Sequence, residues 1–221
     1  MQSQEPCSST SQELFSSASL SDSLLVEKIL LGLKQGNLTS LRSFLFWLNP
    51  SLIVVVLSCC HENLQLGLKF IDLILLNSPD FKHSSLSLSA MIHMLVRGRT
   101  AADAQALILR MVRKSGISRV EVADSLVSTY SSCGSSSLVF DLFVRTYVQA
   151  KKLREGFEAF QVFRSKGVCV SINACNSLLG GLVKVGWIDL AWVVYGEVVS
   201  SGIQLNVYTL NIMVNALCKA R

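Results

Sequence analysis

Proline and charge are both scarce in this sequence. Its 221 residues include only three prolines, and 16% of them are charged against 50% that are hydrophobic. Such a chain is not wholly disordered, because disordered chains combine low hydrophobicity with high net charge. Three prolines and thirteen glycines are also too few for collagen-like or linker-like sequence.

A long uninterrupted hydrophobic run is missing as well. The most apolar stretch extends from Phe44 to Cys60 and is broken by Asn49, Pro50 and Ser51. The part after the break, 52–60, has nine residues, whereas a helix that spans a bilayer needs roughly 20. We therefore expect no membrane span, and we expect Pro50 or Ser51 to open a helix.

Motifs for metals, nucleotides and covalent catalysis are not evident. The seven cysteines include no CxxC pair, and Cys59, Cys60 and His61 are adjacent rather than spaced like zinc ligands. We expect the thiols to be buried and free, in a reducing compartment. Paired carboxylates, Ser–His or Cys–His arrangements and a Gly-rich phosphate loop are also missing. We expect no enzyme activity, no cofactor, no metal and no small-molecule substrate.

Charge is distributed unevenly along the chain. Residues 1–83 carry five Lys or Arg against seven Asp or Glu, whereas residues 84–221 carry fifteen against eight. This asymmetry suggests an anionic partner for the C-terminal part. It is modest over 138 residues, so charge alone does not decide between a partner and none.

The N-terminal third differs from the rest. Residues 1–23 are rich in serine, and we expect them to be disordered. They lack the arginines of a transit peptide, since the first basic residue is Lys28. From Leu24 onward the apolar spacing is helical and no hairpin signal occurs, which indicates an all-α protein. We expect a divergent helical region over 24–84, with two apolar stripes: 24, 25, 29 and 33 before Gly36, and 68, 71, 75 and 76.

The C-terminal part repeats with a period of 35 residues. A shift of 35 places Asn176 on Asn211, Leu182 on Leu217 and Lys184 on Lys219. The frames are 137–171, 172–206 and the partial frame 207–221. The middle frame predicts helices over 174 to about 185 and over 188–200, with glycines at the turns. Such a hairpin cannot bury its apolar face alone, so stacked neighbours and an α-solenoid are predicted.

These frames resemble pentatricopeptide repeats. The segment NVYTLNIMVNALCKAR, 206–221, is similar to the opening of one repeat. Residues 172–203 resemble a full repeat over their whole length, and residues 137–168 resemble another. Residues 87–116 resemble a degenerate repeat, so 85–136 is assigned to that repeat plus an extra helix. The arrangement is similar to plant proteins of the P subclass. The alternative is the tetratricopeptide repeat, whose period is 34 and whose W-x₂-L-G-x₂-Y signature is absent here.

The resemblance implies binding of single-stranded RNA, with about one base per repeat. In the family, the fifth and last residues of a repeat bond the base edge, and the second packs against the base faces. The fifth positions here are Asp141, Asn176 and Asn211, the last are Ser171 and Asn206, and the second are Leu138, Asn173 and Tyr208. Asparagine at both positions of 172–206 implies a pyrimidine, cytosine ahead of uracil. Asp141 with Ser171 implies no clear preference, and Ser89 in the degenerate frame is expected to read nothing.

Other interpretations stay open. An asparagine near a helix start can cap that helix or bond the neighbouring repeat, and for Asp141 we favour capping. The same helices could form a scaffold that binds protein partners. Because Arg221 falls where a second helix is expected to begin, we expect an N-terminal fragment of a longer protein. The resemblance implies a role in RNA processing, stability or translation in the mitochondrion, or alternatively in the chloroplast.

Overall fold

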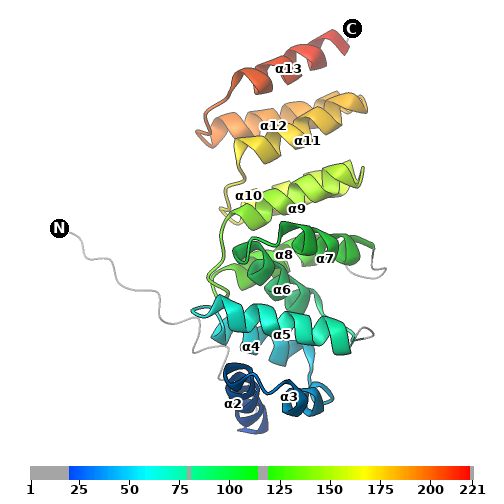
Figure 1. Ribbon diagram of the computed structural model, residues 1–221. Helices are drawn as coiled ribbons and strands as arrows, with labels where there is room; N and C mark the ends of the chain where they lie inside the picture. Colours follow the sequence, from blue (N-terminus) through cyan, green and yellow to red (C-terminus); the bar gives the residue numbers. More distant parts are fainter. Residues whose placement is uncertain (1–19, 79–80, 114–118, 220–221) are drawn as a thin grey trace, which may run out of the picture. The chain divides into compact units, whose positions relative to one another are not determined.

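The computed structural model describes residues 20–78, 81–113 and 119–219. Every regular element in these segments is an α-helix, so the all-α class is confirmed (Figure 1). The described residues divide into two compact units, one reaching residue 100 with 128–136 added, the other formed by 101–127 and 137 onward. The serine-rich residues 1–19, for which disorder is predicted, lie outside the described residues.

The helices of the first unit begin and end at recognisable signals. Helix α2 (Leu20–Gln35) starts four residues before the predicted boundary and is followed by Gly36, whose φ of 71° suits glycine. Helix α4 (Pro50–Cys59) has proline in its first turn, and the Asn49 side chain accepts from the Leu52 amide at 2.8 Å. The other helices of this unit are α3 (Leu38–Leu45), α5 (Leu64–Asn77) and α6 (Ser85–Arg97).

The core of the first unit forms where α4 packs against α6 and where α5 packs against α2, α3 and α6. The predicted stripe on α5 is wrong at Leu76, which is 81% exposed, while Phe70 and Ile74 are fully buried. Leu24 of the first stripe is also exposed. Leucine or isoleucine occupies nearly every position near the end of α5, so the pattern alone does not determine which of them faces inward.

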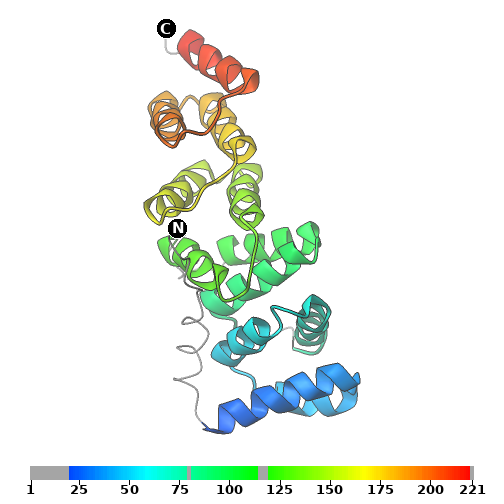
Figure 2. The same cartoon turned by 90° about the vertical axis from the view of Figure 1, so that its left-hand side faces the viewer.

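The second unit consists of helices in two layers. It contains α7 (Ala101–Arg113), most of α8 (Arg119–Tyr130), α9 (Leu138–Gln149), α10 (Leu153–Ser165), α11 (Ile172–Lys184), α12 (Ile188–Ser200) and α13 (Val207–Lys219). Helix α7 packs against α9, α9 against α11, and α11 against α13. Helices α10 and α12 each pack against the first helix of their own frame, and Figure 2 shows both on its left, with α12 above α10. This stacking of hairpins is that of an α-solenoid.

Helix α7 occupies a different place from the one that its sequence suggests. The degenerate frame makes 101–113 a second helix, whereas in the structure α7 packs against the first helix α9. The burial agrees with this placement. Ala104, Ile108 and Met111 are buried in α7, and the residues 35 positions later are buried in α9, namely Val139, Phe143 and Thr146. A half-apolar helix with little sequence identity to its neighbours gives no clear register from sequence.

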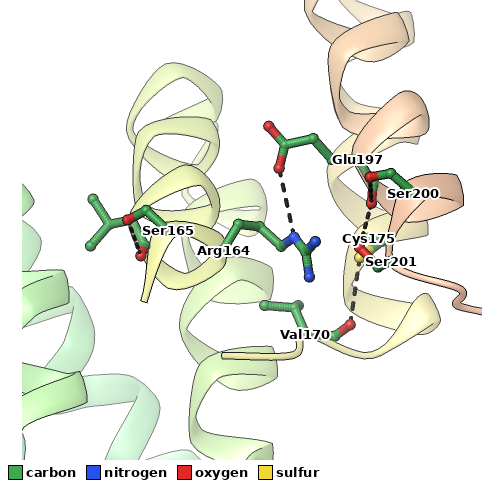
Figure 3. A network of polar contacts seen from close by, with 8 residues as sticks. Arg164, Ser165, Val170, Cys175, Glu197, Ser200 and Ser201 are labelled. Carbon is green, nitrogen blue, oxygen red and sulfur yellow. Dashed lines mark hydrogen bonds and ion pairs between the residues drawn. The ribbon is translucent and has the colours of Figure 1, made fainter. Parts of the chain in front are cut away.

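Aromatic packing holds the α9–α10 hairpin together, and an ion pair joins this frame to the next. The rings of Phe140 and Phe143 lie 4.9 and 5.7 Å from that of Phe163, across the α9–α10 hairpin. Between frames, the Arg164 guanidinium of α10 lies 3.7 Å from a carboxylate oxygen of Glu197 in α12 (Figure 3). Both side chains are largely shielded from water, so this pair is screened less than a surface pair.

Candidate nucleic-acid interface

Two polar contacts recur at the same place in successive frames. The Oδ1 atom of Asp141 accepts from the backbone amide of Ser171 at 2.8 Å. One frame later, Nδ2 of Asn176 donates to Oδ1 of Asn206 at 3.2 Å. Each contact spans 30 residues. The structure therefore brings the fifth and last residues of both complete frames together.

Helix capping falls to the last residue of a frame rather than to the fifth. Ser171 precedes α11, and its hydroxyl accepts from the Ala174 amide at 3.4 Å. Asn206 precedes α13, and its Oδ1 accepts from the Thr209 amide at 2.9 Å and from the Thr209 hydroxyl at 3.0 Å. These are N-cap contacts, which satisfy amides that a helix leaves unpaired.

Capping does not explain Asp141. The side chain that precedes α9 makes no cap hydrogen bond, and Asp141 itself lies inside the first turn of α9. Its carboxylate reaches forward to the Ser171 amide instead. Asn176 likewise lies inside α11 and bonds the cap residue of α13. Both fifth-position side chains thus link their own helix to the residue that starts the next first helix.

The amide orientations at the 176–206 pair are fixed by these contacts. Oδ1 of Asn206 accepts from the Thr209 amide, so the Asn206 Nδ2 group is left as a donor with no hydrogen bond in the described part of the chain. Asn176 is only 3% exposed, and its Oδ1 is buried without a hydrogen-bond partner among the described residues. Since Asn206 is exposed, the group that this pair offers to solvent is a donor.

The remaining predicted residues lie on the surface of the first helices. Leu138 and Tyr208 are 61% and 64% exposed, and Asn173 is exposed as well, each at the start of its helix. Tyr208 offers an aromatic face for base stacking, whereas Leu138 offers an apolar one. Asn211 is exposed on α13 and makes no side-chain hydrogen bond within the described residues. Ser89 of the degenerate frame is buried.

Charge separates between the two layers of the second unit. The first helices α7, α9, α11 and α13 carry five basic and two acidic residues. The second helices α8, α10 and α12 carry three basic and six acidic residues. The layer that holds the paired side chains is therefore the one that attracts an anion.

Sequence reasoning missed Thr209, which is fully buried and holds the Asn206 oxygen. The available signal was the spacing of a capping residue three positions before Thr209. Among the described residues, no group of three metal-ligating side chains occurs. None of the described helices has the length and apolarity that a transmembrane segment requires.

A thiol lies buried close to the first pair. Burial raises the pKa of Cys175 to about 12, and the neighbouring carboxylate of Asp141 adds to the rise. The Cys175 thiol is directed to the carbonyl of Val170, at 3.8 Å (Figure 3). A thiol with this pKa remains protonated at neutral pH and serves here as core packing.

Comparison with known proteins identifies similar chains. A family model described as the PPR repeat family matches residues 170–219. The pentatricopeptide repeat-containing protein At5g01110 of Arabidopsis thaliana is 58% identical over 187 residues, which are 85% of this chain and 26% of that protein. The Arabidopsis thaliana protein At1g11710, named as mitochondrial, is 32% identical over 90% of this chain and 31% of its own length. The chain thus spans between a quarter and a third of these relatives.

Solved structures show a weaker likeness. The match with the maize pentatricopeptide repeat protein PPR10 covers 98% of this chain and 45% of the PPR10 chain, at 13% identity and a TM-score of 0.37. The same protein in complex with an 18-nucleotide psaJ RNA element gives 18% identity and a TM-score of 0.35, over 96% of this chain and 35% of that one. The fold described above rests on the helices of this chain and not on these superpositions.

Proposed function

Because this chain belongs to the pentatricopeptide repeat family, we propose that its second unit binds single-stranded RNA along the layer formed by α7, α9, α11 and α13. The observation that carries the proposal is the recurrence of one contact. The side chains at 141 and 176 each bond the residue 30 positions later, at the start of α11 and α13. Repeats that read bases one by one need the same polar pair at the same place in each unit.

We propose that the orientation of the Asn206 amide contributes to base selection at 172–206. Its Nδ2 donor meets an acceptor on the Watson–Crick edge of a base. Cytosine presents two such acceptors, N3 and O2, side by side. Uracil presents O2 and O4 with an N3–H donor between them, so it fits one donor less well. Adenine and guanine also carry an acceptor on this edge, so the donor alone does not exclude a purine. The preference for a pyrimidine, with cytosine ahead of uracil, is what the resemblance to the pentatricopeptide repeat family implies.

The 137–171 pair presents different chemistry. Oδ1 of Asp141 accepts a hydrogen bond from the backbone amide of Ser171, and the hydroxyl of Ser171 can donate or accept. A hydroxyl that serves in both roles does not discriminate strongly among bases. We propose that this frame holds a base mainly by contact with Leu138, which is exposed in the first turn of α9.

The charge separation supports a nucleic-acid partner over a protein partner. A phosphate backbone carries one negative charge per nucleotide, and the first-helix layer is the basic one. A scaffold for protein partners would not require the basic residues and the paired polar residues on one layer. Binding to this layer should therefore weaken with salt.

We propose a mitochondrial site of action, in the processing, stabilisation or translation of an organellar transcript. The support comes from relatives such as At1g11710 and At1g66345, which are named as mitochondrial. They align with 90% and 93% of this chain. Imaging of a fluorescent fusion of the complete protein tests the location, and signal confined to chloroplasts or cytosol contradicts it.

The decisive experiment is RNA binding by the chain as it stands. Fluorescence anisotropy at 50 mM salt compares oligoadenylate, oligoadenylate with one central cytosine, and the duplex of the latter. We expect a dissociation constant on the order of 10⁻⁵ M for single strands, since few bases are contacted, with tighter binding to the cytosine strand and no preference for duplex. Binding to protein ligands with no RNA binding at 50 mM salt overturns the proposal in favour of the scaffold.

A further inference from the structure

Two arginines hold the same position in successive first helices of the second unit. Arg110 in α7 and Arg145 in α9 are 35 residues apart, and both are exposed. The helices that carry them pack against each other, with buried residues in the same 35-residue register. The two arginines therefore occupy equivalent positions on neighbouring helices, and the axes of packed helices are usually about 8–10 Å apart.

These arginines lie one turn beyond the base-reading position. Arg145 follows Asp141 by four residues, so the two share a helix face and are separated by about 6 Å along the axis. Arg110 stands in the same relation to Ala106. A strand whose bases meet the fifth positions passes its sugar–phosphate backbone beside this face.

The identity of the ninth residue in a frame changes together with the fifth. In the 35-residue register that α7 shares with α9, Ala106 takes the place of the fifth residue, in contrast to the frame expected from sequence, which has Ser89 there. Where this residue is Ala106 or Asp141, which offer no amide, the ninth is arginine. Where the fifth residue is Asn176 or Asn211, the ninth is an uncharged residue, Gly180 or Asn215. Cationic residues at this place thus occur only in the two frames that lack an amide for base reading.

We propose that Arg110 and Arg145 bind successive phosphates of the RNA strand, so that α7 and α9 anchor the backbone while α11 and α13 select bases. The proposal rests on the proposed function. A guanidinium suits this role because its planar donors match two phosphate oxygens at once. The neighbouring carboxylate of Asp141 repels a phosphate, and Arg145, the cation one turn away, compensates for it.

The matched pair of variants is Arg145→Gln and Arg154→Gln. Both remove one positive charge from an exposed arginine of the same frame, but Arg154 belongs to the second helix α10, where it lies 3.9 Å from Glu158. Exposed pairs of this kind contribute little to stability, so both variants should fold. Far-UV circular dichroism checks this.

RNA affinity is measured for the full chain between 50 and 200 mM salt, with the cytosine strand and with oligoadenylate. We expect R145Q to lower the magnitude of the log–log salt slope by about 0.7, the value for one phosphate on a single strand. We also expect about tenfold weaker binding at 50 mM salt, equal for both RNAs. R154Q should keep the wild-type slope, and Arg145→Lys should restore the slope.

The outcomes separate the two proposals. If the wild-type chain binds RNA but R145Q keeps its slope, the phosphate anchor is overturned and the proposed function stands. If R145Q and R154Q change the slope equally, the effect is one of net charge and the anchor is again overturned. If the wild-type chain binds no RNA, the proposed function itself fails.

Discussion

The side-chain nitrogen of Asn176 donates to the side-chain oxygen of Asn206 at 3.2 Å, across 30 residues of sequence. The same Asn206 oxygen accepts from the amide and the hydroxyl of Thr209. The Asn206 oxygen thus caps helix α13 and also accepts a hydrogen bond from α11. These contacts direct the amide nitrogen of Asn206 to solvent. Because capping uses the oxygen of this side chain, the fold determines that its amide nitrogen faces solvent, and this is the group that a base would meet at the proposed interface.

Exchanging Asn206 for aspartate should switch the preferred base. A carboxylate can still accept from Thr209 and Asn176, and negative charge is favourable at a helix N-terminus, so the fold is kept. Its outward oxygen is an acceptor, which fits the N3–H of uracil instead of the N3 of cytosine. We expect the ratio of cytosine to uracil affinity to fall by about tenfold, measured with strands that differ in one base.

The control for this exchange is Asn215→Asp. Asn215 is an exposed residue of the same first-helix layer, so the variant adds the same charge without altering the 176–206 pair. It should weaken cytosine and uracil strands alike. An unchanged ratio in N206D, or an equal change of the ratio in N215D, contradicts the assigned role of the Asn206 amide.

Exchanging Asn176 for aspartate should make stability depend on pH. Residue 176 is 97% buried, and a carboxylate there faces the Asn206 oxygen, which is another acceptor. The ionised form should cost about 2–4 kcal/mol of unfolding free energy. The protonated form can donate to Asn206, so the folded state raises the pKa of the new carboxyl above its unfolded value of about 4.

The sign of that dependence follows from linkage. A carboxyl whose pKa is raised on folding contributes stability below its unfolded pKa and loses it as pH rises through the folded pKa. Urea unfolding of N176D and of the wild type at pH 5 and pH 7.5 should therefore show a larger deficit at pH 7.5. A deficit that is the same at both pH values means that the carboxyl is not buried as described.

The periodic part of the chain was largely predictable from sequence, and the contacts around it were not. Helix α12 covers 188–200 as predicted, because a repeated apolar spacing between turn glycines defines both ends. The juxtaposition of Asn176 and Asn206 was implied by the family resemblance, but the capping bond that orients Asn206 depends on Thr209, which no repeat comparison marks. The prediction that Leu76 lies in the core is wrong, because in a helix rich in leucine the face that turns inward depends on the neighbouring helices.

Native cysteines should differ sharply in reactivity. Burial raises the pKa of Cys60 to about 12, with the neighbouring Cys59 adding to the rise, and burial raises that of Cys133 to about 11. Cys169 and Cys218 are exposed. Because the thiolate is the reactive form, a maleimide at pH 7.5 should modify these two first among the cysteines that the structure describes.

Mass spectrometry of peptides after brief labelling checks this expectation. Cys175, whose pKa burial raises to about 12, should be labelled only when urea unfolds the second unit. Its labelling rate against urea concentration then reports the unfolding of the layer that carries the paired side chains. Fast modification of Cys175 without urea contradicts the packing of α11.

Replacing Lys151 by glycine should stabilise the second unit. Lys151 and Gly186 occupy the same position after the first helices of their frames, and both have positive φ, 58° and 84°. A side chain in this conformation destabilises the fold by roughly 1–2 kcal/mol. Glycine removes this strain, but its larger loss of backbone entropy on folding offsets about 0.5–1 kcal/mol of the gain. We expect a net gain of about 0.5–1 kcal/mol by urea denaturation. The neighbouring Lys152 has a φ of −97°, so Lys152→Gly should destabilise instead, and an equal loss in both variants excludes strain at Lys151.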